Sequence, residues 1–261
     1  MTKGSTPETE EIQPNKDADM SEILTIPLEE ARKHLNQLRA EERLAWALEQ
    51  FGGNFVLTTS FGIQSAVMLH MLHTLKSGAE VPVIWIDTGY LPRETYCYAE
   101  ELSNQLGLDI RAIQSPISPA RMEALYGKLW ETNSVEDIEK YHLIRKVKPL
   151  EQALKDLNVQ CWASGVRGNQ TDHRRSMTLL DNIRGRFSLR PLLEWTQKDV
   201  FYYMQKNDLP QHPLFDKGYS SVGDWHSSAP DGDQGKGRET RFGGLKQECG
   251  IHVQGVSGEG I

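Results

Sequence analysis

The sequence predicts an α/β protein with a mainly parallel sheet, helices on both faces of that sheet, and a C-terminal tail. Apolar runs typical of buried strands alternate with amphipathic helical stretches between residues 54 and 205. After about residue 212 the chain is rich in Gly, Asp, Ser, Lys and Arg and has almost no apolar periodicity. We therefore expect a disordered N-terminal tail at residues 1–24, an α/β domain at 25–215 and a mobile tail at 216–261.

The expected elements follow one another along the chain. Apolar residues at helical spacing predict two helices within residues 28–51, which Gly52 and Gly53 end. Strands are expected at 54–59, 81–86, 108–113, 160–163 and 187–190, and further helices at 66–75, 92–106, 119–126, 148–157 and 197–205. Pro92 suits the first turn of its helix and Gly107 its C-terminal cap, and Thr196 can cap the last helix.

Composition limits the functions that the chain can have. Its 261 residues carry 29 basic and 36 acidic side chains, a net charge of −7, so it lacks the basic excess of a general nucleic-acid-binding surface. The first twenty residues are polar and acidic, unlike a signal peptide, and no apolar run is long enough to span a bilayer. Three widely spaced cysteines form neither a disulfide framework nor a metal-ligand pattern. We expect a cytoplasmic protein with no bound metal and no nucleic-acid or membrane partner.

Cys249 is the expected nucleophile, because it lies in the polar tail and has no core to belong to. Cys97 and Cys161 fall in a predicted helix and a predicted strand, where we expect small core residues. A thiol becomes nucleophilic when nearby cations favour its thiolate over the thiol, whose unperturbed pKa is about 8.5. The basic neighbours of Cys249 in the tail are Arg238, Arg241, Lys246 and His252, and the acidic ones are Glu239 and Glu248.

Two loops lie at the ends of predicted strands, where the ligands of open α/β sheets bind. The loop Ser60–Ser65 opens a helix, and the backbone amides of a helix N-terminus favour a phosphate or sulfate. Its Gly62 allows close approach of an anion, although many strand-to-helix turns contain Gly and Ser without binding one. The loop Asp87–Tyr90 suits a ligand site and equally well a plain helix entry.

Basic residues gather in predicted loops, although the chain as a whole is acidic. They are Arg145 with Lys146 and Lys148, Arg167, Arg174 with Arg175, and Arg184 with Arg186. Guanidinium groups bind phosphate and sulfate oxygens through paired hydrogen bonds. Any single loop arginine is more often solvated, so it is the whole set that indicates an anion site.

These segments together resemble the phosphoadenylyl-sulfate (PAPS) reductase family. The matching segments are Thr59–Val67, Asp87–Tyr90, Tyr126–Glu131, Gly218–Asp224, Glu239–Phe242 and Glu248–His252, in the family's order over about residues 50–252. The ending Cys-Gly-Ile-His is the most specific of them. The resemblance implies an adenine-nucleotide α-hydrolase fold, with a nucleotide-binding domain at 25–215 and a catalytic tail at 216–261.

The resemblance also implies a thioredoxin-dependent reaction in sulfate assimilation, carried out by a homodimer. The Cys249 thiolate would attack the sulfur of 3′-phosphoadenylyl sulfate and become S-sulfocysteine, and thioredoxin would then release sulfite. The mobile tail would close over the nucleotide first and open to the reductant afterwards. The implied catalytic residues are Cys249 and His252, and the implied substrate-binding residues are Ser60, Gly62, Gln64, Ser65, Asp87, Gly89, Lys146, Arg167, Arg174, Arg175, Arg238 and Arg241.

Departures from related families refine the expected substrate. Adenylyl-sulfate reductases hold an iron–sulfur cluster on cysteines, and the corresponding positions here are Tyr141, His142, Asp224 and Ser227, none of which supplies a thiolate. The resemblance therefore implies no bound cofactor, no cluster and a 3′-phosphorylated substrate. The alternatives are an adenylyl-sulfate reductase, an ATP pyrophosphatase-type adenylating enzyme and a non-enzymatic nucleotide-binding protein. Phe61 and Gln64 argue against the second, because they replace its glycine and its magnesium-binding aspartate.

Overall fold

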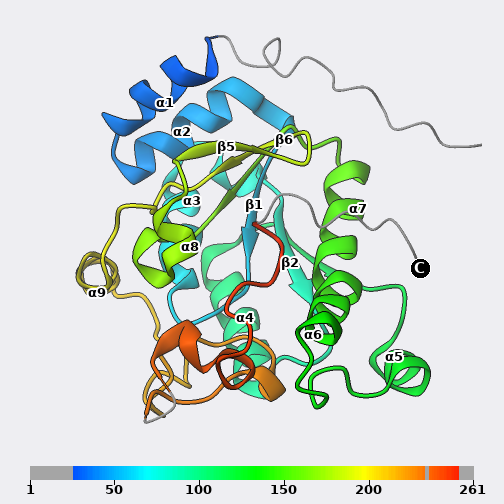
Figure 1. Cartoon of the computed structure of the whole chain (residues 1–261). Helices are drawn as coiled ribbons and strands as arrows, with labels where there is room; N and C mark the ends of the chain where they lie inside the picture. The colour runs from blue at the N-terminus through cyan, green and yellow to red at the C-terminus, as the bar shows by residue number, and fades with distance from the viewer. Residues whose placement is uncertain (1–25, 233–234, 253–261) are drawn as a thin grey trace, which may run out of the picture.

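A parallel sheet covered on both faces forms the centre of the molecule (Figure 1). The computed structural model describes residues 26–232 and 235–252, so the expected disordered tail at 1–24 lies outside the described residues. Within these residues six strands pair in the order β3-β2-β1-β4-β6-β5. Every pair is parallel except β5 with β6. The predicted fold class is confirmed.

The strands bury apolar side chains on both faces of the sheet. Their bounds are β1 (Phe55–Thr59), β2 (Val83–Asp87), β3 (Ile110–Gln114), β4 (Cys161–Ser164), β5 (Leu180–Ile183) and β6 (Arg186–Leu189). Successive side chains of a strand point to opposite faces, so Phe55 and Leu57 join one apolar cluster and Val56 joins the other. The sequence analysis missed β5, because Asp181 and Asn182 interrupt its apolar pattern.

Helices cover both faces of the sheet. The cluster around Phe55 and Leu57 is completed by α1 (Leu28–Asn36), α2 (Ala40–Phe51), α3 (Ser65–Thr74), α4 (Arg93–Leu106) and α9 (Gln197–Lys206). On the opposite face α7 (Lys148–Asp156) packs against Val56, Ile84 and Trp162. The remaining elements are α5 (Pro119–Tyr126), α6 (Val135–His142), the π-helix η4 (Leu143–Val147), α8 (Asp172–Arg175), and the 3₁₀ turns η2 (Gly52–Asn54), η3 (Gly78–Glu80), η5 (Gly168–Gln170), η6 (Trp225–Ser227) and η7 (Gly237–Gly244).

The expected helix ends are largely correct. Gly107 ends α4 in the left-handed conformation, with φ of +57°, and the Thr196 hydroxyl accepts a hydrogen bond from Asp199 N at 3.2 Å. Pro92 lies one residue before α4 rather than inside its first turn. The sequence analysis missed α6, although Ser134 caps it by accepting a hydrogen bond from Asp137 N and Ile138 gives it a buried face.

The described part of the tail packs against the domain at the lower end of the sheet in Figure 1. Its composition predicted little burial, yet Val222, Asp224, Thr240 and Arg241 are all buried. The expectation is wrong because polar side chains of the tail pair with one another instead of with water. The Arg241 guanidinium, for example, donates to the hydroxyls of two tail serines. Movement of the tail remains a prediction.

The cysteines of the domain differ in exposure. Cys161 is fully buried in β4, as predicted, and this burial raises the pKa of its thiol. Cys97 is exposed, so its predicted place in the core is wrong. The buried face of α4 is formed by Thr95, Tyr98 and Leu102, and Cys97 lies on a different face of the helix.

We predict that Cys97 reacts with iodoacetamide in the native protein and Cys161 does not. A Cys249→Ser variant isolates the two thiols. Alkylation of Cys161 should be at least about 100-fold slower, because a buried strand residue is exposed only when the protein unfolds. Peptide mass spectrometry over a time course gives both rates, and full reaction of both thiols in denaturant is the control. Similar native rates would contradict the two placements.

Candidate active site

A cavity of about 250 Å³ lies at the carboxyl ends of β1, β2 and β4. Thr59, Thr88 and Ser164 line it from the ends of the three strands or the position that follows. From β1 the chain builds the sheet outward through β2 and β3, and then returns to add β4 on the other side of β1. Ligands of open α/β sheets bind at such a change of direction. The cavity therefore lies where the sequence analysis expected a ligand.

The loop before α3 forms one wall of the cavity. Ser60, Gly62, Gln64 and Ser65, all predicted to bind substrate, line it. Because α3 begins at Ser65, its N-terminus faces this space. The intervening Phe61 is fully buried and packs edge-on against Trp85, with ring centroids 4.9 Å apart. The loop thus presents polar groups and backbone to the cavity and its aromatic ring to the core.

Asp87 and Gly89 do not line the cavity, and their expected contact with substrate is not found. The Asp87 carboxylate accepts hydrogen bonds from Gly89 N at 2.8 Å, from the Tyr96 hydroxyl at 2.6 Å and from Gln114 Nε2 at 2.6 Å. Gly89 has φ of +74°, and a Cβ there would lie 2.6 Å from Pro119 Cγ. Both residues shape the loop after β2, which presents Thr88 to the cavity.

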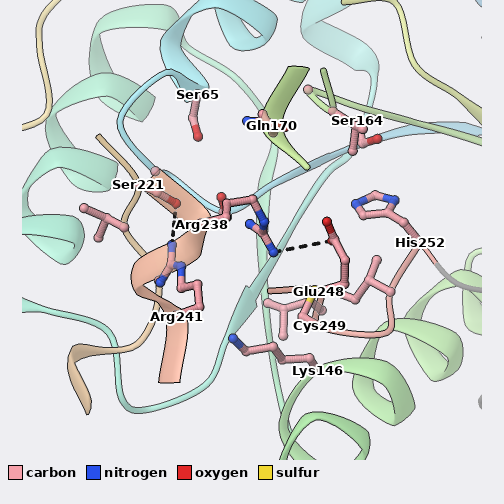
Figure 2. A pocket seen from close by; sticks show the side chains of 18 of the residues that line it. Ser65, Lys146, Ser164, Gln170, Ser221, Arg238, Arg241, Glu248, Cys249 and His252 are labelled. Carbon is pink, nitrogen blue, oxygen red and sulfur yellow. Dashed lines mark hydrogen bonds and ion pairs between the residues drawn. The ribbon is translucent and has the colours of Figure 1, made fainter. Parts of the chain in front are cut away.

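Guanidinium groups from η7, those of buried Arg241 and partly buried Arg238, make the cavity cationic (Figure 2). Arg241 donates to Ser228 Oγ at 2.6 Å and to Ser221 Oγ at 2.8 Å. The Nε atoms of Arg238 and Arg241 are buried without a hydrogen-bond partner. Burial, with the charge of Arg238 adding to it, lowers the pKa of Arg241 to about 9. A bound anion stabilises a cation whose pKa is lowered by burial and by a neighbouring cation.

Two of the other predicted arginines, Arg167 and Arg175, do not line the cavity. Arg167 lies behind the loop before α3, where it donates to Gln64 Oε1. Burial, together with the charge of Arg174, lowers the pKa of Arg167 to about 10. Arg175 is exposed and pairs with Asp172 at 2.8 Å, so its expected contact with substrate is not found either.

Arg174 is held by the tail. Glu248 Oε1 accepts hydrogen bonds from Arg174 Nε at 2.9 Å and from the Thr171 hydroxyl at 2.8 Å, and Glu248 Oε2 accepts one from Arg174 Nη2 at 2.9 Å. Arg174 Nη1 donates to Gln170. Burial opposes the charge on Glu248, but Arg238 and Arg174 outweigh it and lower the pKa of the carboxyl. In this closed arrangement Arg174 binds the tail rather than a phosphate.

Lys146 also lines the cavity, and a buried carboxylate holds it there. Its Nζ lies 2.6 Å from Oδ2 of Asp224, which is fully buried and accepts a hydrogen bond from the Thr88 hydroxyl. Burial opposes the ionisation of Asp224, but the charge and hydrogen bond of Lys146 hold its pKa well below the usual range. The π-helix η4 places Lys146 on the cavity while the neighbouring Arg145 donates to Thr88 O behind it.

Asp224 is also one of the four positions at which the related adenylyl-sulfate reductases are expected to hold their cluster, and the other three lie near it. The Ser227 hydroxyl donates to Asp224 O at 3.2 Å, and the Tyr141 hydroxyl lies 3.1 Å from His226 Nε2. His142 is buried beside them and lines the cavity. Hydroxyl, carboxylate and imidazole groups do not fit an iron–sulfur cluster, which requires thiolates here. Within residues 26–232 and 235–252, no group of His, Cys, Asp and Glu side chains is arranged to hold a metal ion.

Cys249 and His252, the predicted catalytic residues, both line the cavity. Cys249 is half-buried and lies between Lys146 and the contact of Arg238 with Glu248 in Figure 2. The His252 ring stacks on Trp162 at a centroid distance of 5.1 Å. Burial, and after it the charge of Arg174, lowers the pKa of His252 well below the usual value. The cationic role expected for His252 remains a prediction.

Comparison with known proteins gives the family. A sequence model of the phosphoadenosine phosphosulfate reductase domain matches residues 54–230. A protein named phosphoadenosine 5′-phosphosulfate reductase from Synechococcus sp. is 53% identical over 227 residues, which cover 87% of this chain and 97% of the relative. A protein of the same name from Vibrio cholerae is 47% identical over 228 residues, covering 87% and 89% of the two chains. This chain belongs to the phosphoadenosine phosphosulfate reductase family.

Solved structures agree with this membership. A phosphoadenylyl-sulfate (PAPS) reductase from Candida auris, crystallised as a phosphate complex, matches 79% of this chain and 99% of its own, with a TM-score of 0.67 and 28% identity. The ATP complex of Candida glabrata FMN adenylyltransferase, 14% identical with a TM-score of 0.52, shares the fold alone. The reductase domain match ends before Arg238 and Cys249, so the geometry of the tail is an observation separate from it.

We predict that Asp224→Asn lowers the free energy of unfolding by about 3 kcal/mol, because it leaves the charge of Lys146 without its buried partner. Urea denaturation at neutral pH measures the change. Asp172→Asn is the control: it breaks the exposed pair with Arg175, and should cost less than about 0.5 kcal/mol. Equal losses in the two variants would show that the buried pair does not hold this part of the tail.

Proposed function

We propose that this protein reduces 3′-phosphoadenylyl sulfate to sulfite and adenosine 3′,5′-bisphosphate, in sulfate assimilation. The observation that carries the proposal is the position of Cys249, a half-buried thiol in a cavity lined by Lys146, Arg238 and Arg241. The names of the relatives from Synechococcus and Vibrio cholerae support the choice of substrate. No helix within the described residues is long and apolar enough to cross a membrane. We also propose a cytoplasmic homodimer, which rests on the family resemblance.

The first step transfers the sulfonate group to the protein. The Cys249 thiolate attacks the sulfur of the sulfate, and a sulfur–sulfur bond forms while the bond to the anhydride oxygen breaks. That oxygen keeps the electron pair and leaves as a phosphate of adenosine 3′,5′-bisphosphate. Since phosphate is a stable anion, the step requires no strong general acid. Lys146, Arg238 and Arg241 are placed to stabilise the charge on the phosphate and sulfonate oxygens.

The second step releases sulfite and restores the thiol. One thiolate of a dithiol, which we propose to be thioredoxin, attacks the Cys249 sulfur to form a mixed disulfide, and sulfite leaves with the electron pair of the broken sulfur–sulfur bond. The second thiol of the reductant then attacks its own partner sulfur and expels Cys249 as a thiolate. The dithiol is oxidised to a disulfide, and its two electrons leave on sulfite. No bound cofactor takes part.

The closed tail supports a cycle in which the tail moves. Tail residues, among them Arg238, Arg241 and Cys249, form part of the wall of the cavity. The Glu248 carboxylate also forms an ion pair with Arg174, which therefore does not face the cavity as a free cation. We propose that the tail withdraws to admit the nucleotide, closes over it for sulfonate transfer, and opens once more to the dithiol.

The cavity favours this chemistry over cleavage of ATP. An adenylating enzyme needs carboxylates to hold magnesium on the triphosphate. The two carboxylates that line the cavity, Asp224 and Glu248, are already paired with Lys146 and Arg174. At the loop itself, Gln64 has an amide where a magnesium-binding carboxylate would be needed, and its oxygen accepts a hydrogen bond from Arg167.

We predict that incubation with 3′-phosphoadenylyl sulfate in the absence of reductant adds one sulfonate group to Cys249. Intact-mass measurement followed by peptide mapping locates the group, and Cys97 and Cys161 should stay unmodified. Cys249→Ser should gain no mass and form no sulfite, because no other thiol lies in the cavity. An unmodified Cys249 under saturating nucleotide would contradict the mechanism.

We predict that the 3′-phosphorylated nucleotide is the better substrate. Each charged hydrogen bond to the 3′-phosphate is worth about 1.5–3 kcal/mol, so kcat/KM should exceed that for adenylyl sulfate by at least about tenfold. Sulfite formation with reduced thioredoxin, compared between the two nucleotides, measures the ratio. Equal or faster turnover of adenylyl sulfate would favour the alternative assignment as an adenylyl-sulfate reductase.

A further inference from the structure

The hairpin of β5 and β6 has an unusual residue at its tip. Arg184 and Gly185 form a two-residue turn between Ile183 and Arg186, which pair across the hairpin. Both turn residues have positive φ, +50° at Arg184 and +74° at Gly185. Such turns favour Asn, Asp or Gly at both positions, because longer side chains rarely adopt the left-handed conformation. An arginine at this position strains the backbone, and such strain persists only where other interactions of the residue compensate for it.

The Arg184 side chain reaches the tail immediately beyond Cys249. Its Nη2 donates to Ile251 O at 2.9 Å, and its Nη1 donates to Gly250 O at 3.3 Å. Its Nε donates to Glu151 Oε1 at 2.7 Å, which fixes the direction of the guanidinium from α7. The side chain is only 16% exposed, so these bonds are partly shielded from water. Arg184 does not line the cavity and so is not placed to bind the nucleotide itself.

Arg186 provides an internal comparison. It follows the same turn and donates to the other oxygen of the same carboxylate, Glu151 Oε2, at 2.9 Å. Its side-chain exposure of 19% is close to that of Arg184. The two residues differ in that Arg184 also bonds to the carbonyls of Gly250 and Ile251.

The residue before Cys249 is held from the other side. Glu248 receives the paired hydrogen bonds of Arg174, as described above. Ile251 packs against the apolar cluster of Val56 and Trp162. The thiol is therefore carried by a short segment fixed at both ends, by Arg174 at Glu248 and by Arg184 at the two residues that follow.

We propose that Arg184 is a positioning residue for Cys249, which sets the thiol against the bound sulfate by holding the backbone of Gly250 and Ile251. The proposal rests on the proposed function and adds to it a residue that touches neither substrate nor reductant. Sulfonate transfer requires the closed segment, whereas attack by the dithiol requires an open one. Loss of the two carbonyl contacts should therefore slow the first step and leave the second equally fast or faster.

The test compares Arg184→Asn with Arg186→Gln. Asparagine suits the left-handed turn, so Arg184→Asn keeps the hairpin but removes the hydrogen bonds to the carbonyls of Gly250 and Ile251. The first step is followed as the rate at which Cys249 gains sulfonate from 3′-phosphoadenylyl sulfate without reductant. The second is followed as sulfite release from protein already carrying the sulfonate, after addition of dithiothreitol.

We expect Arg184→Asn to slow the first step by at least about tenfold, because misplacing a nucleophile by about 1 Å can cost a hundredfold in rate. We expect it to leave the second step unchanged or faster, and not to lower Tm. Arg186→Gln should behave as wild type in both steps. A first step as fast in Arg184→Asn as in Arg186→Gln would overturn the proposal. Slowing of both steps together with a lower Tm would also overturn it, since that result indicates a structural role.

Two further measurements cover the remaining outcomes. If Arg184→Asn does not fold, Glu151→Gln replaces it, because it loosens the side chain that directs Arg184 and should slow the first step alone. If wild type gains no sulfonate, the proposed function fails. The hold of Arg184 on the tail is then tested separately by alkylation of Cys249 with iodoacetamide. Alkylation should be several-fold faster in Arg184→Asn than in Arg186→Gln, because an open tail exposes the thiol. Equal alkylation rates would refute it.

Discussion

The paired hydrogen bonds between Arg174 and Glu248 are the interaction on which the site depends. They join α8 of the domain to the residue that precedes Cys249, and so bring a thiol from the end of the chain into a cavity built by strands of its first two-thirds. A second ion pair near the thiol, between Lys246 of the tail and Glu139 of α6, is more exposed. The same link pairs the negative charge of the Glu248 carboxylate with the positive charge of Arg174. The remaining lining is cationic, with five Lys and Arg side chains against the two carboxylates of Asp224 and Glu248.

The sheet explains why these groups meet at one place. The parallel strands β1, β2 and β4 end together, and the crossovers leave in opposite directions on the two sides of β1, which opens a space that side chains from loops can line. One wall supplies the N-terminus of α3 and a second supplies Lys146 from a π-helix. Two arginines of η7, Arg238 and Arg241, complete it, at a cost in desolvation that a bound sulfate or phosphate would offset.

The sequence predicted the fold class, because apolar runs are a local pattern. It also singled out Ser60–Ser65 and Cys249, which the structure brings to one cavity, from glycine positions and from the lack of apolar periodicity in the tail. The sequence analysis failed where contacts between distant parts of the chain determine what a side chain binds. Asp87 and Gly89 were predicted to bind a ligand because they lie at a strand end. Instead the Asp87 carboxylate accepts a hydrogen bond from its own loop, and Gly89 lies so close to Pro119 that a Cβ would clash. Among the arginines, nothing local distinguishes buried Arg174 from exposed Arg175, whose partners lie 74 and 3 residues away in the chain. Burial of the tail was missed for the same reason, since its polar residues are stabilised by one another.

The claim that Cys249 lies against the bound nucleotide is the centre of this mechanism, and protection from alkylation tests it most directly. The rate of reaction of Cys249 with iodoacetamide would be measured while adenosine 3′,5′-bisphosphate is titrated, with binding followed independently by calorimetry. Cys249 should become at least about tenfold slower to react, in proportion to occupancy, because the bound product and the closed tail together shield the thiol. The exposed Cys97 should react at a constant rate throughout. A Cys249 that reacts as fast in the saturated protein as in the free one would contradict the placement of the thiol at the nucleotide site.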